Sequence, residues 1–374
     1  MTVDPAALAP RAELVTVDDF EAAAAARLPA MAYDYYRSGA DEEHTLRRNR
    51  DAWTTYELWY RTLVDVCAPQ LRTTVLGTEV ASPILIAPTA YHALADAEGE
   101  RATARAAADV GSLYVASTLA TTSLEDVAAA APGAPRWFQL YVHKDREFTA
   151  RLVERAKSAG YGAIVVTCDT PVLGRRCADV RNGFALPAGL VMANLVEILP
   201  PDLGEGAGSE LARFVASRHD ASFTWKDLRA IADACAPLPL VVKGIVRGDD
   251  AREALDQGAQ AVWVSNHGGR QLDLAPSTAD GLEEVVSAID GRAEIYVDGG
   301  IRSGTHALVA LGLGARAVFV GRPVLWGLAA DGRAGVARVL ALLGDELVRA
   351  MQLAGCTDVT AVARDLVRRS RLLR

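Results

Sequence analysis

The sequence predicts a closed (β/α)8 TIM barrel with an N-terminal helical cap and a long loop after the fourth barrel strand. From residue 83 onward, short apolar runs alternate with Ala-rich helical stretches, which is typical of alternating strands and helices. The runs are continuously apolar, which indicates strands covered on both faces. Polar residues follow at the carboxyl ends of the runs, and in a barrel these ends meet at one mouth. An open, doubly wound sheet is the alternative, because the number of strands alone does not prove closure.

Residues 17–82 are expected to form the cap in front of the barrel. Asp18 to Tyr36 is predicted as one helix that ends at Ser38-Gly39. Asp41 to Trp53 is predicted as a second helix, whose acidic start favours its N-terminus.

The barrel is predicted over residues 83–330. Its strand candidates are Pro83 to Pro88, Leu113 to Ser117, Trp137 to Tyr141, Ala163 to Thr167, Leu238 to Lys243, Ala261 to Ser265, Glu294 to Asp298 and Ala317 to Gly321. The fourth connection is far longer than the others, and Leu195 to Ser222 within it lacks clear periodicity. We therefore expect a mobile loop over the mouth there.

Residues 331–374 are expected to form C-terminal helices. Val336 to Met351 is predicted as an amphipathic helix outside the barrel. No internal linker divides the chain, so residues 1–374 are predicted as a single domain.

Composition argues against several classes of function. The chain has 374 residues, a hydrophobic content of 51% and a net charge of −8, so it can bury a large core and has no basic footprint for nucleic acid. The first thirty residues are acidic and lack a secretory signal, which predicts a cytoplasmic protein. The best membrane candidate, Leu308 to Ala330, contains two arginines and a proline, so no membrane partner is expected.

No metal is expected either. The five cysteines are an odd number without CxxC spacing, unlike a disulfide framework or a zinc site.

The segment from Ser265 to Asp273 predicts a catalytic base beside an anion clamp. It directly follows the apolar run Ala261 to Val264, so His267 and Arg270 leave the end of a buried strand together. Histidine exchanges a proton near neutral pH, and arginine holds a carboxylate through two parallel hydrogen bonds. The pair suits removal of a proton from an acidic substrate.

Glycines and arginines after the last two strands predict a phosphate site. Gly299, Gly300 and Arg302 follow strand seven, and Gly321 and Arg322 follow strand eight, where many barrels bind phosphate. Tight turns with surface arginines are the alternative interpretation.

Lys243 at the end of strand five should face an anionic partner, because an unpaired buried ammonium is costly. The partner is either a structural carboxylate or a reduced flavin, whose negative charge a cation stabilises. Asp169, Arg175 and Arg176 follow strand four, and we expect one of the two arginines to be a surface charge.

Motifs in order along the chain add a specific resemblance. They are Tyr33 to Ala40, Ala87 to Ala90, Phe138 to Tyr141, Asp169 to Pro171, Leu173 to Arg176, Val242 to Gly244, Ser265 to Asp273 and Asp298 to Gly300. Over residues 17–356 the chain resembles the FMN-dependent (S)-2-hydroxy acid oxidases, which include glycolate, lactate and 4-hydroxymandelate oxidases.

The resemblance implies a role for each matched residue. His267 is the implied base, Arg176 and Arg270 grip the substrate carboxylate, Tyr35 and Tyr141 hydrogen-bond the substrate, and Asp169 stabilises the protonated imidazole. The residues implied to bind FMN are Pro88, Thr89, Ala90, Ser117, Gln139, Thr167, Lys243 and Ser265 at the ring, Asp298 near the ribityl chain, Gly300, Arg302, Gly321 and Arg322 at the phosphate, and also Gly299.

The implied reaction oxidises a 2-hydroxy acid to a 2-keto acid, and O2 reoxidises FMN to give H2O2. His267 takes either the α-proton or the hydroxyl proton, and the sequence leaves both routes open. A dehydrogenase that passes electrons to a quinone or other acceptor is the nearest alternative. A non-redox barrel isomerase is the alternative from another class. The resemblance also implies a homotetramer.

Two departures from glycolate oxidase bear on the substrate. Leu119 stands where that enzyme has Trp, and Tyr91 stands where it has Met. A larger pocket with an aromatic wall predicts larger aliphatic or aromatic substrates, such as mandelate.

Overall fold

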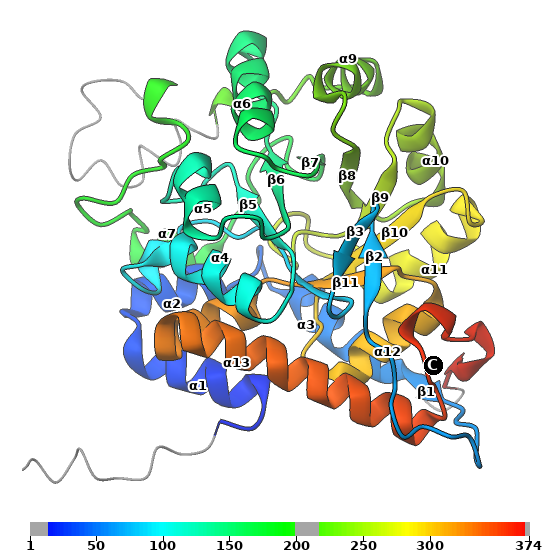
Figure 1. Ribbon diagram of the computed structural model, residues 1–374. Coiled ribbons are helices and arrows are strands. Elements are labelled where there is room, and N and C mark those ends of the chain that lie inside the picture. Colours follow the sequence, from blue (N-terminus) through cyan, green and yellow to red (C-terminus); the bar gives the residue numbers. More distant parts are fainter. Residues whose placement is uncertain (1–13, 199–216, 371–374) are drawn as a thin grey trace, which may run out of the picture.

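The computed structural model describes residues 14–198 and 217–370, and in it the barrel is closed (Figure 1). Eight parallel strands are hydrogen-bonded in the order β10-β11-β4-β5-β6-β7-β8-β9, and the ring closes between β9 and β10. They are β4 (Ile84–Ile86), β5 (Tyr114–Ser117), β6 (Arg136–Leu140), β7 (Ile164–Thr167), β8 (Leu240–Ile245), β9 (Ala261–Val264), β10 (Glu294–Asp298) and β11 (Ala317–Val320). The predicted fold class is confirmed, and the open-sheet alternative is wrong.

Helices follow the barrel strands and surround them (Figure 1). They are α4 (Gly99–Asp109), α5 (Leu124–Ala130), α6 (Arg146–Ser158), α9 (Trp225–Cys235), α10 (Gly248–Asp256), α11 (Thr278–Ile289), α12 (Gly304–Leu313) and α13 (Arg322–Ala354). The short helix α7 (Cys177–Asn182) lies in the connection after β7. Most of the loop predicted over the mouth, residues 199–216, falls outside the described residues.

The first cap helix was predicted as one element and is two, α1 (Val17–Arg27) and α2 (Ala30–Arg37). Leu28 between them is extended, with ψ of 144°, because the following Pro29 disfavours helical geometry at the residue before it. The second predicted helix is shorter than expected. α3 (His44–Asp51) begins after Glu43, whose φ of 62° is left-handed, and Ala52–Thr55 continues it as a 3-10 turn.

Four short strands outside the barrel were missed in the sequence. β1 (Tyr56–Leu58) pairs with β12 (Val367–Arg369), and β2 (Thr73–Val75) pairs with β3 (Thr78–Val80). Each has three residues, which is too short to show an alternating pattern. The turn between β2 and β3 has positive φ at both central residues, a favoured hairpin geometry, although Leu76 occupies the first of them.

The C-terminal helix was also predicted too short. Val336 to Met351 is the second half of α13, which starts directly after β11 and is interrupted by non-helical geometry at Asp331 and Gly332. In Figure 1, α1 lies along part of α13, and the two helices are in contact.

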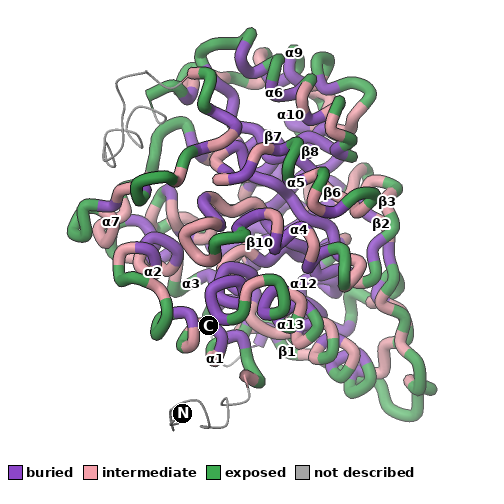
Figure 2. Tube along the Cα trace, turned by 60° about the vertical axis from the view of Figure 1, so that its left-hand side comes forward, coloured by how far each residue is buried: buried purple, intermediate pink, exposed green. Residues whose placement is uncertain are grey.

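The inside of the barrel is filled by large aromatic side chains. Trp137, Trp263, Tyr296 and Phe319 are at most 1% exposed, and the Trp263 and Phe319 rings lie 3.8 Å apart. Val75 and Val80 of the β2–β3 hairpin belong to the same cluster and extend it beyond the strands. Figure 2 shows this buried interior under an exposed outer surface. Because the interior is solid, a ligand can reach the strands only at an end.

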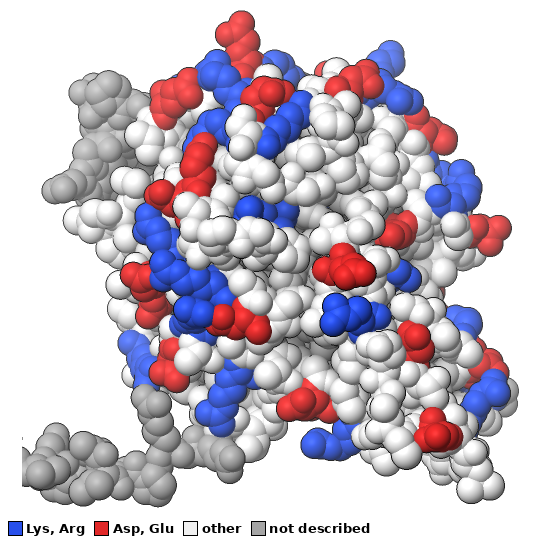
Figure 3. Space-filling model, in the orientation of Figure 1, with Lys and Arg blue, Asp and Glu red and all other residues white. Residues whose placement is uncertain are grey.

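Acidic and basic side chains are interspersed on the face drawn in Figure 3, and no large basic patch gathers there. Among the helices of the described residues, none has the length and apolar character that crossing a membrane requires.

Candidate active site

A cavity of about 1060 Å³, including its open mouth, lies at the carboxyl ends of the barrel strands. Most residues predicted for the site line it. They are Tyr35, Pro88, Thr89, Ala90, Ser117, Leu119, Gln139, Tyr141, Thr167, Arg176, Lys243, His267, Arg270, Asp298, Gly299, Gly300, Arg302, Gly321 and Arg322. Side chains from every barrel strand or the loop after it therefore converge on one space, together with Tyr35 of the cap.

His267 stands on a backbone that few residues adopt. Its φ is 59°, and those of Gly268 and Gly269 are 64° and 75°, so three successive residues are left-handed. The hydroxyl of Ser265 accepts a hydrogen bond from the His267 backbone N–H at 3.1 Å. A Cβ on Gly269 would lie 2.6 Å from the backbone nitrogen of Leu46, so this glycine permits close contact with the cap.

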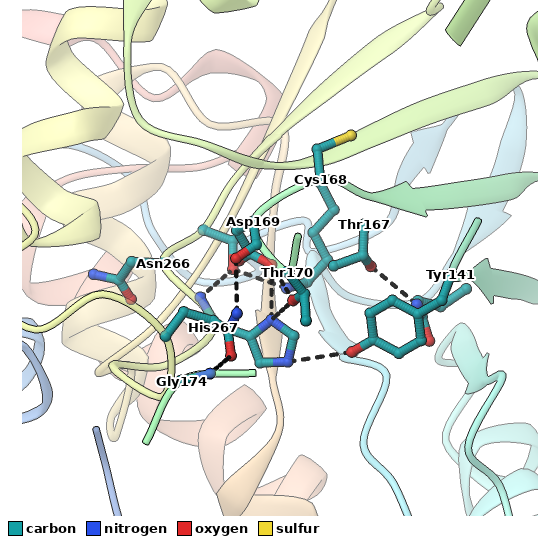
Figure 4. Close-up of polar contacts among 12 residues, drawn as sticks. Tyr141, Thr167, Cys168, Asp169, Thr170, Gly174, Asn266 and His267 are labelled. Atoms are coloured by element: carbon teal, nitrogen blue, oxygen red, sulfur yellow. Dashed lines mark hydrogen bonds and ion pairs between the residues drawn. The ribbon is translucent and has the colours of Figure 1, made fainter. Parts of the chain in front are cut away.

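Asp169 and Tyr141 contact opposite nitrogens of the His267 ring (Figure 4). Nδ1 lies 2.8 Å from a carboxylate oxygen of Asp169, and Nε2 lies 3.4 Å from the phenol oxygen of Tyr141. A carboxylate accepts hydrogen bonds, so Nδ1 carries the proton and the lone pair is on Nε2. Nε2 is therefore the basic atom of the site.

Burial and charge oppose each other at this pair. Burial lowers the pKa of His267, while the Asp169 carboxylate raises it in part. Burial raises the pKa of Asp169, but the contacts with His267, together with the Lys243 charge and the Thr170 hydroxyl, outweigh burial, and the net pKa is below its ordinary value. His267 is therefore held neutral, next to a carboxylate that stabilises it once it takes a proton.

Two guanidinium groups flank the ring of Tyr35. The Arg270 carbon Cζ lies 5.0 Å from the ring centroid, and that of Arg176 lies 5.6 Å from it. Nη1 of Arg270 donates to the carbonyls of Tyr35 and Ser38, whereas its other nitrogens make no hydrogen bond to the described residues. The pKa of Arg270 falls to about 10, chiefly through burial and then through Arg176. An anion between the two arginines would offset this repulsion.

The prediction for the Arg175 and Arg176 pair agrees with the structure. Arg176 lines the cavity, and its guanidinium lies 3.5 Å from Asp179, whereas Arg175 is exposed.

Of the two partners expected for Lys243, the structure shows the carboxylate. Its ammonium lies 3.2 Å from Asp298 and donates to the Ser265 hydroxyl at 2.8 Å, so the structural ion pair exists. Lys243 and Asp298 also line the cavity. The lysine is thus held by the protein in a position where it can face a ligand.

The glycine-rich end of the cavity carries excess positive charge. Burial lowers the pKa of Arg302, and burial together with Arg270 and Arg302 puts the pKa of Arg322 well below its usual range. The buried Nε of Arg302 has no hydrogen-bond partner among the described residues. A Cβ on Gly300 would lie 1.9 Å from the backbone oxygen of Asn49, so only glycine fits against α3 here.

The predicted side-chain pocket is only partly as expected. Leu119 lines the cavity, but Tyr91 lies behind Tyr35 and is not in the lining. The Tyr91 and Tyr35 rings lie 5.4 Å apart, and the Tyr91 hydroxyl contacts the sulfur of Met192 at 3.8 Å. Phe184 stacks on Tyr35 with a centroid distance of 4.2 Å.

Asp169 and Ser265 do not line the cavity themselves. Asp169 contacts the ring of His267, and Ser265 accepts a hydrogen bond from Lys243.

Sequence reasoning missed several residues of the site. Tyr36, Leu173, Gln271, Ile301, Phe319 and Leu325 line the cavity, and Thr170 lies 3.4 Å from Nδ1 of His267. Gln271 joins two loops, because its amide donates to the carbonyls of Asp169 and Val172. Its place inside the segment Ser265 to Asp273 was a signal that could have identified it.

Comparison with known proteins agrees with this geometry. Residues 24–369 match the model of a family described as FMN-dependent dehydrogenase. The chain is 47% identical to human 2-hydroxyacid oxidase 1 over 362 residues, covering 96% of this chain and 98% of that protein. It is 50% identical to L-lactate oxidase of Nostoc sp. over 349 residues, covering 92% and 95%.

Solved structures are similar over the same length. A mandelate oxidase with (S)-2-phenylpropionate has a TM-score of 0.85 and 42% identity, covering 95% of this chain and 98% of that chain. An active mutant of (S)-mandelate dehydrogenase has a TM-score of 0.89 and 37% identity, covering 96% and 100%.

Proposed function

The chain belongs to the family of FMN-dependent dehydrogenases, and from this premise we propose that it oxidises an (S)-2-hydroxy acid to the 2-keto acid and reduces O2 to H2O2. One observation carries the proposal. A neutral imidazole with a carboxylate behind it and two guanidinium groups open into the same cavity. This combination suits a small acid that loses a proton and two electrons.

The residues of the cavity fit FMN. The phosphate needs cations and backbone N–H groups, and Arg302 with its unpartnered Nε, Arg322 and the glycines after β10 and β11 would supply them. Lys243, Gln139 and Thr167 would hold polar atoms of the ring. When bound, FMN supplies a two-electron acceptor.

Arg176 and Arg270 would hold the substrate carboxylate. Both are partly buried and face Tyr35, so an incoming carboxylate loses water but gains two charge-assisted partners. Tyr35 and Tyr141 would hydrogen-bond the substrate from two sides. Binding at these groups fixes the position of the α-carbon relative to His267, and such orientation supplies much of the rate.

His267 then accepts a proton at Nε2. In one route the proton comes from the α-carbon; in the other it comes from the hydroxyl while the α-hydrogen leaves with its electron pair. In both routes the substrate loses two protons and two electrons and becomes a 2-keto acid. Asp169 stabilises the imidazolium through Nδ1.

Larger aliphatic or aromatic 2-hydroxy acids are the proposed substrates. Leu119 and Leu173 contribute aliphatic surface to the cavity, and the stacked Tyr35 and Phe184 contribute aromatic surface near it. The similarity to a mandelate oxidase over 95% of the chain supports the same substrate class. Tyr91 supports Tyr35 from behind.

An acceptor other than O2 is the second candidate. The similarity to (S)-mandelate dehydrogenase favours it, as do exposed aliphatic side chains at Val172, Leu272 and Leu274 in the loops that follow β7 and β9. Membership of an FMN-dependent redox family argues against a non-redox isomerase.

A single titration tests the proposal. The FMN-loaded protein is mixed without oxygen with glycolate, lactate, 2-hydroxyoctanoate and both enantiomers of mandelate, and the flavin absorbance is followed. We expect bleaching by the larger (S)-acids and recovery with stoichiometric peroxide when air is admitted. Bleaching without rapid recovery would favour another acceptor. No bleaching by any of the acids would refute the proposal.

A further inference from the structure

Two buried histidines beside the cavity have no role in the chemistry described above. His143 and His219 are 1% and 5% exposed. None of their four ring nitrogens has a hydrogen-bond partner among the described residues. Buried polar groups are normally paired, so these two rings are held here by something other than hydrogen bonds.

Their rings, in contrast, pack against other aromatic rings. The His219 ring stacks on Tyr141, with centroids 4.5 Å apart and planes 25° from parallel. The His143 ring makes a T-shaped contact with His219, with centroids 5.6 Å apart and planes at 84°, and another with Phe148, at 5.0 Å and 87°. Stacked and edge-to-face contacts are the geometries that aromatic rings prefer. The four rings form a continuous row from α6 to the phenol that faces Nε2 of His267.

The backbone holds His219 firmly against this row. Residues 219 and 143 form an antiparallel bridge, and the N–H of Lys144 donates to the carbonyl of Arg218 at 2.9 Å. The N–H of Asp220 donates to the carbonyl of Val142 at 3.1 Å, and the Asp220 carboxylate pairs with Arg146. The segment carrying His219 is thus tied to the residues that directly follow Tyr141 in the chain.

Burial lowers the pKa of both His143 and His219 to about 4. Both rings are therefore uncharged at neutral pH, and His219 adds no positive charge next to His267.

We propose that His219 is a positioning residue for Tyr141, whose ring face keeps the phenol hydroxyl in place at Nε2 of His267. The ring nitrogens take no part. The inference rests on the proposed function, because Tyr141 matters only if the substrate binds beside it. It adds a second layer to the site, contributed by the chain segment that returns to the barrel before α9.

Two substitutions at position 219 distinguish the effect of the aromatic ring face from that of the ring nitrogens. His219→Ala removes the stacking face, and we expect the rate of anaerobic flavin reduction at saturating substrate to fall roughly two- to tenfold. His219→Phe keeps the face without the nitrogens and should restore most of that rate. Lys144→Met is a matched control, because it removes only the bond from Nζ to the Ser217 carbonyl, so its rate should match that of the unaltered protein.

A double substitution shows whether the effect passes through Tyr141. In a Tyr141→Ala background the stacking partner is gone, so His219→Ala should cause no further loss. FMN content and the visible spectrum should be the same in all variants, which excludes a general collapse of the site.

The possible results discriminate clearly. If the unaltered protein is not reduced by any hydroxy acid, the proposed function fails. If it is reduced and His219→Ala is equally fast, or His219→Phe is as slow as His219→Ala, the positioning role is refuted while the proposed function stands. Equal losses from His219→Ala with and without Tyr141 would also refute it.

Discussion

The Asp169 carboxylate lies 2.8 Å from Nδ1 of His267, although 98 residues separate the two in the sequence. Asp169 follows β7 and His267 follows β9, and β8 lies between these strands in the barrel. A Cβ on Gly244, at the end of β8, would lie 2.7 Å from Asp169, so the absence of a side chain there lets the loop pass over β8. The order of the strands thus decides which nitrogen of the base carries the proton.

His267→Gln tests the base directly. Glutamine retains a polar group of similar size but cannot act as a base near neutral pH, so we expect flavin reduction to slow by about 10²- to 10⁴-fold. Stopped-flow absorbance under anaerobic conditions measures this rate. FMN should remain bound at one per chain, because the FMN-facing cations and glycines are unchanged. Rapid reduction in this variant would contradict the assignment.

Asp169→Asn separates the charge of the partner from its shape. The amide still fills the space, but it no longer stabilises an imidazolium, so we expect a loss between about 10²- and 10⁴-fold in kcat/KM. The Asp169 charge raises the pKa of His267, so its removal lowers that pKa further. The acid limb of the kcat/KM profile should therefore move to lower pH. If the acid limb does not move, the group that titrates there is not His267.

Arg176 and its neighbour offer a matched pair. Arg176→Met removes a partly buried cation that faces Tyr35, and we expect the substrate dissociation constant to rise roughly ten- to a hundredfold. Arg175 is exposed, so Arg175→Met should change the substrate dissociation constant by less than about twofold relative to the unaltered protein. Titration of each FMN-loaded variant with a non-reacting acid, such as the 2-keto product, measures both constants. Equal effects at the two positions would contradict the assignment of Arg176.

The barrel could be predicted because its strands are buried on both faces and are therefore mostly apolar. That signal does not depend on knowing the fold. The cap could not be predicted as well, because its short strands carry no such signal and its helices depend on local breaks. Pro29 was visible in the sequence and does mark the boundary between α1 and α2. Glu43, with its left-handed backbone, carries no comparable signal.

The site was predictable where function depends on position after a strand. His267, Arg270 and Lys243 follow β9 and β8 directly, and strand order brings them together. Residues that act through packing were not predictable. Phe184 and His219 reach the site from a long connection, and no spacing rule relates them to Tyr35 or Tyr141.

Leu119→Trp tests the size of the substrate pocket. An indole in the cavity wall would occupy space that a large substrate side chain needs, and overpacking of this kind costs about 1–3 kcal/mol. We expect kcat/KM for mandelate to fall roughly ten- to a hundredfold while that for glycolate changes little. Leu119→Met conserves volume and serves as the control. Parallel losses for both acids would show that Leu119 does not contact the side chain.

Stability should fall in mild acid because several buried or partly buried histidines are held in their neutral form. Burial lowers the folded-state pKa of His143, His219 and His306 to about 4, from an ordinary value of 6.5. Between these two pH values the unfolded chain binds protons that the folded chain does not, so the stability present above pH 6.5 is lost as the pH falls toward 4. Each such histidine steepens the loss by up to about 1.4 kcal/mol per pH unit.

A variant with both His143→Phe and His219→Phe tests this origin of acid sensitivity. The two phenyl rings keep the aromatic row but cannot take up a proton. We expect the drop in thermal midpoint between pH 7 and pH 5, measured at one heating rate with FMN in excess, to be clearly smaller in the variant. Carboxylates contribute to acid unfolding in both proteins, so the comparison isolates the two imidazoles. An equal drop in variant and unaltered protein would mean that these rings are already charged, or exposed to water, in the folded chain at pH 5.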